Sequence, residues 1–153
     1  MAQVKRKVLI PVDGSEDSQG AFDFYIDNLM KKDDEVEILH IQHTPHLSVL
    51  SLHDPMNIPV EEWSHKLKDE VKKSQALIAH YEMLCEQKHL AKKSLLGSGK
   101  PGEAICEKAK ECGADMIVMG SRGQNAVRRT FVGSVSDYVL HHAHIPITIV
   151  PRK

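Results

Sequence analysis

The chain of 153 residues has no excess of either charge, because 20 Lys and Arg nearly balance 21 Asp and Glu, for a formal net charge of -1. A balanced charge creates no overall field that would attract nucleic acid or an anionic membrane surface. We therefore expect neither as a partner. Any site for an anion has to be built locally.

Cysteine is scarce and long apolar runs are absent. The three cysteines are odd in number and form no Cys-x-x-Cys motif, which excludes a disulfide framework and indicates reduced thiols. Residues 1–13 carry several charges and too few apolar positions for a signal peptide or a membrane span. No repeat, low-complexity tract or linker interrupts the sequence, so we predict one domain over residues 1–153, in the cytoplasm.

Common catalytic motifs are missing as well. Gly99-Lys100 is followed by Pro101, which does not fit a Walker A loop, and Gly120 opens no Gly-x-Gly-x-x-Gly. No nucleophile elbow, Ser-His-Asp order or pair of carboxylates marks a hydrolase. Ten histidines include the clusters 40–46 and 141–144, but no cysteine or carboxylate completes a zinc set, so we interpret them as solvated or partly buried.

What the sequence does contain is an alternation of short apolar runs with amphipathic segments. The pattern predicts strands at 8–12, 36–41, 91–96, 115–120 and 147–150, and helices at 16–30, 60–88, 103–112 and 133–143. Ser15 is expected to cap the first helix, and residues 44–60 form a long loop whose role, lid or partner-binding element, is left open. In the longest helix Trp63, Leu67, Val71 and Tyr81 share one apolar face, which we expect to pack in the core.

Strands rich in Val, Ile and Leu that alternate with helices are typical of a doubly wound α/β fold. Its strands are parallel, buried on both faces and joined by right-handed crossovers. Ligands of such folds bind beyond the carboxyl ends of the strands, where the strand order reverses. We therefore look for a site at those ends.

The densest group of small residues follows the fourth predicted strand. Gly120-Ser121-Arg122-Gly123 allows the backbone to bend and to approach a ligand closely, and Gly133-Ser134 then opens a helix. The free amides of a helix start favour phosphate, with Ser134 and Ser136 as added hydroxyl donors. Arg122, Arg128 and Arg129 add positive charge nearby. The alternative is a plain strand-to-helix turn followed by a serine cap.

The spacing of these glycines resembles the ATP-binding signature of the universal stress protein family. That signature is matched here by Gly120-x-x-Gly123, nine intervening residues, and Gly133-Ser134. Residues 8–15, Gly97-x-x-x-Pro101-x-x-x-Ile105, 114–123 and 146–150 resemble other segments of the family. The resemblance implies a three-layer, Rossmann-like fold, with a five-stranded parallel sheet of order 3-2-1-4-5.

The resemblance also implies the residues of an adenine nucleotide site. Asp13 and the backbone of Pro11 and Val12 would meet the adenine and ribose end, and Ile41 would offer backbone hydrogen bonds to the adenine edge. Met119, Gly120, Arg122 and Gly123 would follow the ribose and the α-phosphate, while Gly133, Ser134, Val135 and Ser136 would hold the outer phosphates. Mg²⁺ would bridge phosphate oxygens, because it prefers phosphate and water ligands. Asp13 has an alternative role, as a turn residue bonded to its own backbone.

On this reading the function is ATP-dependent regulation in a stress response, through a homodimer that pairs along the last strand, residues 147–150. An apolar edge strand favours such pairing, because an open edge invites association. A slow ATPase or a phosphoryl- or adenylyl-transferring enzyme on the same site is the alternative. A module that binds no nucleotide is disfavoured by the intact glycine signature.

Overall fold

The computed structural model describes residues 4–44, 59–122 and 132–152. Its elements in chain order are β1 (Lys7–Pro11), α1 (Glu16–Phe24), the π-helical turn η1 (Tyr25–Leu29), β2 (Glu35–Gln42), α3 (Val60–Gln87), β3 (Ala91–Ser98), α4 (Pro101–Cys112), β4 (Met116–Gly120), α5 (Ser134–His142) and β5 (Ile147–Val150). Ser15 caps α1 as predicted, since its side chain accepts a hydrogen bond from the Ser18 amide. Most of the predicted loop 44–60 lies outside the described residues.

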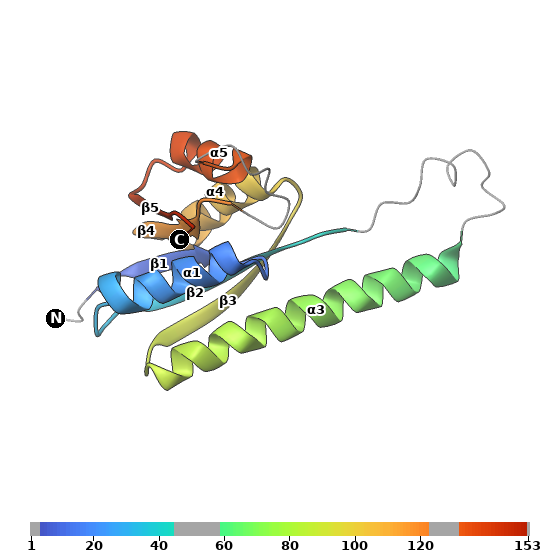
Figure 1. Cartoon of the computed structure of the whole chain (residues 1–153), viewed down its shortest axis with the longest axis horizontal. Helices are drawn as coiled ribbons and strands as arrows, with labels where there is room; N and C mark the ends of the chain where they lie inside the picture. The colour runs from blue at the N-terminus through green and yellow to red at the C-terminus, as the bar shows by residue number, and fades with distance from the viewer. Residues whose placement is uncertain (1–3, 45–58, 123–131, 153) are drawn as a thin grey trace.

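The five strands form one parallel sheet in the order β3-β2-β1-β4-β5, which confirms the predicted fold class. Figure 1 shows α1 and α3 lying apart from α4 and α5 on the two sides of this sheet. Strands β1 and β4 are neighbours, although the chain leaves β1 toward β2 and leaves β4 toward β5. The strand order therefore reverses between the carboxyl ends of β1 and β4.

Two apolar layers fill the space between the sheet and its helices. On one face Val8, Ile10 and Val36 of the strands pack with Phe22 of α1 and Tyr81 of α3. The other layer is built from alternate strand residues and from α4 and α5; its fully buried side chains include Leu9, Leu39, Ile105, Ile117 and Val139. Alternate strand residues thus serve opposite faces, as a sheet covered on both sides requires.

Helix α3 is longer than the sheet that it covers, and here the prediction of a continuous buried face is wrong. Tyr81 is 1% exposed, whereas Leu67 is 36% and Val71 is 39% exposed. Figure 1 shows the amino-terminal half of α3 extending past the strands. Helical periodicity orients side chains to one side, but only a sheet beneath that side can bury them.

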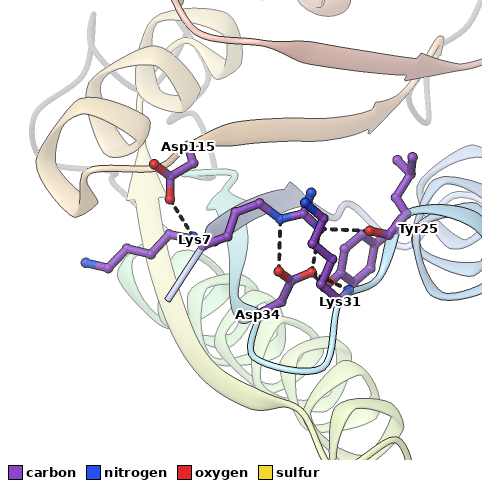
Figure 2. A network of polar contacts seen from close by, with 7 residues as sticks. Lys7, Tyr25, Lys31, Asp34 and Asp115 are labelled. Atoms are coloured by element: carbon purple, nitrogen blue, oxygen red, sulfur yellow. Dashed lines mark hydrogen bonds and ion pairs between the residues drawn. The ribbon is translucent and has the colours of Figure 1, made fainter. Parts of the chain in front are cut away.

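A polar network holds the amino edge of the sheet together (Figure 2). Asp34 accepts two hydrogen bonds from the Arg6 guanidinium at 2.9 and 2.6 Å, one from the Tyr25 hydroxyl at 2.8 Å and one from the Lys31 amide at 2.9 Å. Burial alone would raise the pKa of Asp34, but these donors outweigh it and the pKa is lowered. Asp115 accepts a hydrogen bond from the Lys7 amide at 2.7 Å, which ties β1 to the loop before β4.

Candidate functional site

The turn after β1 lies at the carboxyl end of the sheet, and its backbone forms hydrogen bonds within the protein. The Val12 amide donates to the Leu39 carbonyl at 2.8 Å, and the Val12 carbonyl lies 2.9 Å from Nδ1 of His40. Val12 is 3% exposed. Both polar groups of its backbone are therefore used within the protein. The Val12 amide is not free to donate to a ligand, and the Val12 carbonyl already accepts one hydrogen bond.

Asp13 forms part of its own turn, as the alternative reading expected. Its Oδ1 accepts a hydrogen bond from the Ser15 amide at 3.0 Å. The Asp13 amide lies 3.4 Å from the Ser18 hydroxyl, which is itself 3.5 Å from the hydroxyl of Tyr81 on α3. These contacts fix the direction in which the chain leaves β1.

Ile41 lies near the end of β2, beyond the last residue of β1. The β1–β2 register ends with Pro11 opposite Leu39, and the Leu39 carbonyl points toward β1, where it accepts from Val12. Backbone groups two residues apart on a strand point the same way, so the amide and carbonyl of Ile41 are also directed to the β1 side. On its other side Ile41 is paired in register with Gly97 of β3. The strand end thus presents one donor and one acceptor side by side.

The end of β4 and the start of α5 meet in space. The Gly133 amide donates to the Ser121 carbonyl at 2.6 Å. The Ser136 hydroxyl lies 3.0 Å from that same carbonyl and 3.0 Å from the Gly133 carbonyl, and Ser136 is 1% exposed. The Ser136 side chain therefore ties the two segments together from inside. Ser134, at the first turn of α5, is exposed.

Two glycines allow this convergence. A Cβ on Gly120 would lie 2.7 Å from the Asp17 carbonyl oxygen, and one on Gly133 would lie 2.9 Å from the Ser121 carbonyl oxygen. Both contacts are with backbone atoms, so a side chain would force the segments apart. The two positions predicted to approach a ligand closely also approach the protein's own chain closely.

The amino terminus of α5 is a favourable place for negative charge. Gly133 occupies the cap position with extended backbone, and no side chain caps the helix among the described residues. The first-turn amides and the helix dipole favour an anion at this end. Arg122 lies two residues after the end of β4. Met119 is 5% exposed and belongs to the apolar layer of α4 and α5, against which Val135 packs. Gly123, Arg128 and Arg129 lie outside the described residues.

Sequence reasoning missed Asp17. It lies on the first turn of α1 against Gly120 and is 8% exposed, and its Oδ2 has no hydrogen-bond partner among the described residues. Arg152, just past β5, lies 3.8 Å from Oδ1 of Asp17 and 2.5 Å from Glu16. The only sequence signal for this contact was the position of two acids after the Ser15 cap, which is common to many helices.

The described residues include no group of three or more His, Cys, Asp or Glu side chains that could hold a metal ion. The same part of the chain has no helix both long and apolar enough to cross a bilayer.

Comparison with known proteins gives a consistent picture. The model of the universal stress protein family matches residues 5–151. The universal stress protein YxiE of Bacillus subtilis is 29% identical over 145 residues, covering 94% of this chain and 97% of that protein.

Solved structures agree with the fold. The structure of the MJ0577 protein of Methanocaldococcus jannaschii superposes with a TM-score of 0.76 at 26% identity, covering 99% of both chains. A universal stress protein of Arabidopsis thaliana with AMP bound superposes with a TM-score of 0.67 at 20% identity, covering 97% of this chain and 92% of that one.

Proposed function

The chain belongs to the universal stress protein family, and on that basis we propose that it binds an adenine nucleotide, ATP in the first place, at the carboxyl edge of its sheet. The observation that carries the proposal is the meeting of β4 and α5, where the Gly133 amide bonds to the Ser121 carbonyl at 2.6 Å. This contact brings the amino terminus of α5 beside the point at which the strand order reverses. Both features favour a phosphate-bearing ligand.

The proposed site has a base end and a phosphate end. At the base end the amide and carbonyl of Ile41 would pair with the N1 and amino group of adenine, while Asp13 with the turn at Pro11 and Val12 would border the ribose. At the phosphate end Gly120, Arg122 and Gly123 would follow the α-phosphate, and Gly133, Ser134 and Val135 would meet the outer phosphates. Ser136 would act by holding this end in shape, since its hydroxyl is bonded within the protein.

Mg²⁺ fits this arrangement as an ion carried by the nucleotide. Mg²⁺ prefers phosphate oxygens and water as ligands over a set of protein side chains. The start of α5 offers hydroxyl and amide donors, which suit the phosphates. When bound, the ion neutralises phosphate charge. Main-chain amides of the chain would hold the phosphates.

We further propose that nucleotide binding regulates a homodimer. Strand β5 lies at one end of the sheet, and all four of its residues, Ile147–Val150, are only partly buried. The Ser121 amide donates to the Val150 carbonyl at 3.0 Å, so the edge strand is bonded directly to the chain that leads into the phosphate end. A ligand that binds this end better in one dimer geometry would shift the population of that geometry.

Isothermal titration of the purified chain with Mg-ATP tests the proposal, with ADP, AMP and GTP as comparisons. Adenine nucleotides are expected to bind more tightly than GTP, and mass spectrometry of natively purified protein would identify any nucleotide that it retains. An absence of heat above dilution at millimolar ATP would refute the proposal. Product analysis over time on the same sample separates binding from slow hydrolysis.

A further inference from the structure

His40 connects two backbone segments proposed to border the nucleotide, the end of β2 and the turn after β1. It lies on β2, directly before Ile41, and it is 8% exposed. Its ring nitrogen Nδ1 lies 2.9 Å from the carbonyl oxygen of Val12, in the turn after β1. A carbonyl can only accept, so Nδ1 carries the proton and donates it.

This hydrogen bond replaces one that a regular sheet would contain. The Val12 amide donates to the Leu39 carbonyl at 2.8 Å, as in a continuing parallel ladder. The next bond of that ladder would run from the Ile41 amide to the Val12 carbonyl. Among the described residues this bond is absent, and the Val12 carbonyl bonds to the His40 ring instead.

We propose that His40 is a positioning residue, which keeps the carboxyl ends of β1 and β2 from pairing further and so leaves the Ile41 amide available to a ligand. This inference rests on the proposed nucleotide site, because it assigns the ligand in question as the adenine base. The ring satisfies a buried carbonyl whose partner in a continuing ladder would be the Ile41 amide.

The proposal separates binding from stability. If the ring donor is removed, the Val12 carbonyl can bond to the Ile41 amide, so the sheet gains a hydrogen bond while the base loses its partner. A merely structural role would instead lower stability and affinity together. An amide side chain can replace the donor, because the Nδ2 of asparagine lies close to the position of the histidine Nδ1.

The test compares His40→Leu, His40→Asn and the unchanged chain. His65→Leu is the control, since His65 is exposed near the amino terminus of α3. We expect His40→Leu to raise the Kd for ATP about tenfold, the effect of roughly one lost hydrogen bond at a buried site, and His40→Asn and His65→Leu to stay close to the unchanged chain. Hydrogen exchange of the Ile41 amide without nucleotide should be fast in the unchanged chain and slow in His40→Leu.

The outcomes separate the two proposals. Equal affinity and equal Ile41 exchange in His40→Leu and the unchanged chain would overturn the role of His40 and leave the nucleotide site standing. Equal weakening by Leu and Asn would overturn it as well, since the ring rather than its donor would then matter. If the unchanged chain binds no adenine nucleotide, the proposed function and this use of His40 fall together. Should His40→Leu fail to fold, His40→Gln takes its place, because its longer side chain carries the amide away from the Nδ1 position.

Discussion

Replacing Gly133 by alanine tests the junction on which the proposed site depends. The added methyl group would lie 2.9 Å from the Ser121 carbonyl oxygen, about 0.5 Å inside the ordinary contact range that begins at 3.4 Å. The neighbouring atoms are backbone, so no flexible side chain can move aside. The first bond to stretch would be the one from the Gly133 amide to the Ser121 carbonyl, which measures 2.6 Å.

The expected cost follows from that bond. Weakening a backbone hydrogen bond and straining its surroundings is worth about 1–2 kcal/mol, which corresponds to a fall in melting temperature of roughly 2–8 °C for a chain of this size. The same displacement moves the start of α5 away from the phosphates. We therefore expect the Kd for Mg-ATP to rise about 5- to 30-fold, measured by isothermal titration on protein shown by circular dichroism to be folded.

Gly20→Ala is the matched control. A Cβ on Gly20 would meet nothing within 4 Å, and the residue lies inside α1. Alanine should therefore raise stability by up to about 1 kcal/mol and leave the Kd unchanged. Affinity and stability of Gly133→Ala equal to those of the unchanged chain would show that the close approach has no consequence. A loss of stability with unchanged affinity would show that the junction lies outside the ATP site.

Three further expectations concern charge and hydroxyl groups. Because the pKa of Asp34 is lowered in the folded state, its contribution to stability is present above its ordinary pKa and is lost as the pH falls below about 4. Urea unfolding from pH 3 to 6 should therefore show a flatter pH dependence for Asp34→Asn than for the unchanged chain. Glu37 is 1% exposed, and burial raises its pKa, so ionising it costs stability as the pH rises through the raised value. The difference in stability between Glu37→Gln and the unchanged chain should therefore favour Glu37→Gln more at pH 7 than at pH 4, and an equal difference at both pH values would refute this. Ser136→Ala should lower the free energy of unfolding by about 1 kcal/mol, whereas Ser134→Ala should weaken ATP binding with no change in stability; the opposite assignment would mean that the two hydroxyls exchange roles.

Much of the fold could be predicted because local chemistry and burial agree along most of the chain. The apolar runs at β1, β2 and β4 favour a sheet covered on both faces. The Ser15 cap could be predicted because its own side chain accepts the hydrogen bond from the Ser18 amide. The predicted helix 16–30 is less regular than expected, since α1 passes into a π-helical turn at Tyr25–Leu29. The Tyr25 hydroxyl donates a hydrogen bond to Asp34 across the turn into β2. Helical periodicity alone could not predict this contact.

The site shows why residue types alone do not assign roles. Glycine at 120 and 133 is what a phosphate loop needs, but the same positions are filled closely by the backbone of Asp17 and Ser121. Ser136 has the residue type of a phosphate ligand, yet its hydroxyl is bonded inside the junction. His40 was grouped with other histidines by sequence, whereas its bond to Val12 depends on how far β1 extends beside β2.

Because α3 extends past the sheet, its two parts differ in how well they tolerate amino-acid substitutions. In the carboxyl-terminal part, Tyr81 and Cys85 are buried in one apolar cluster with residues of α1 and the strands, so a replacement there must fit a fixed space. In the amino-terminal part, exposed pairs such as Glu62 and Lys66 lie at 2.7 Å on an open surface, and there the main requirement is that the residues favour a helix in water. The exposed positions of this segment can therefore accumulate substitutions, and with them new surface chemistry, while the sheet and its carboxyl end are preserved.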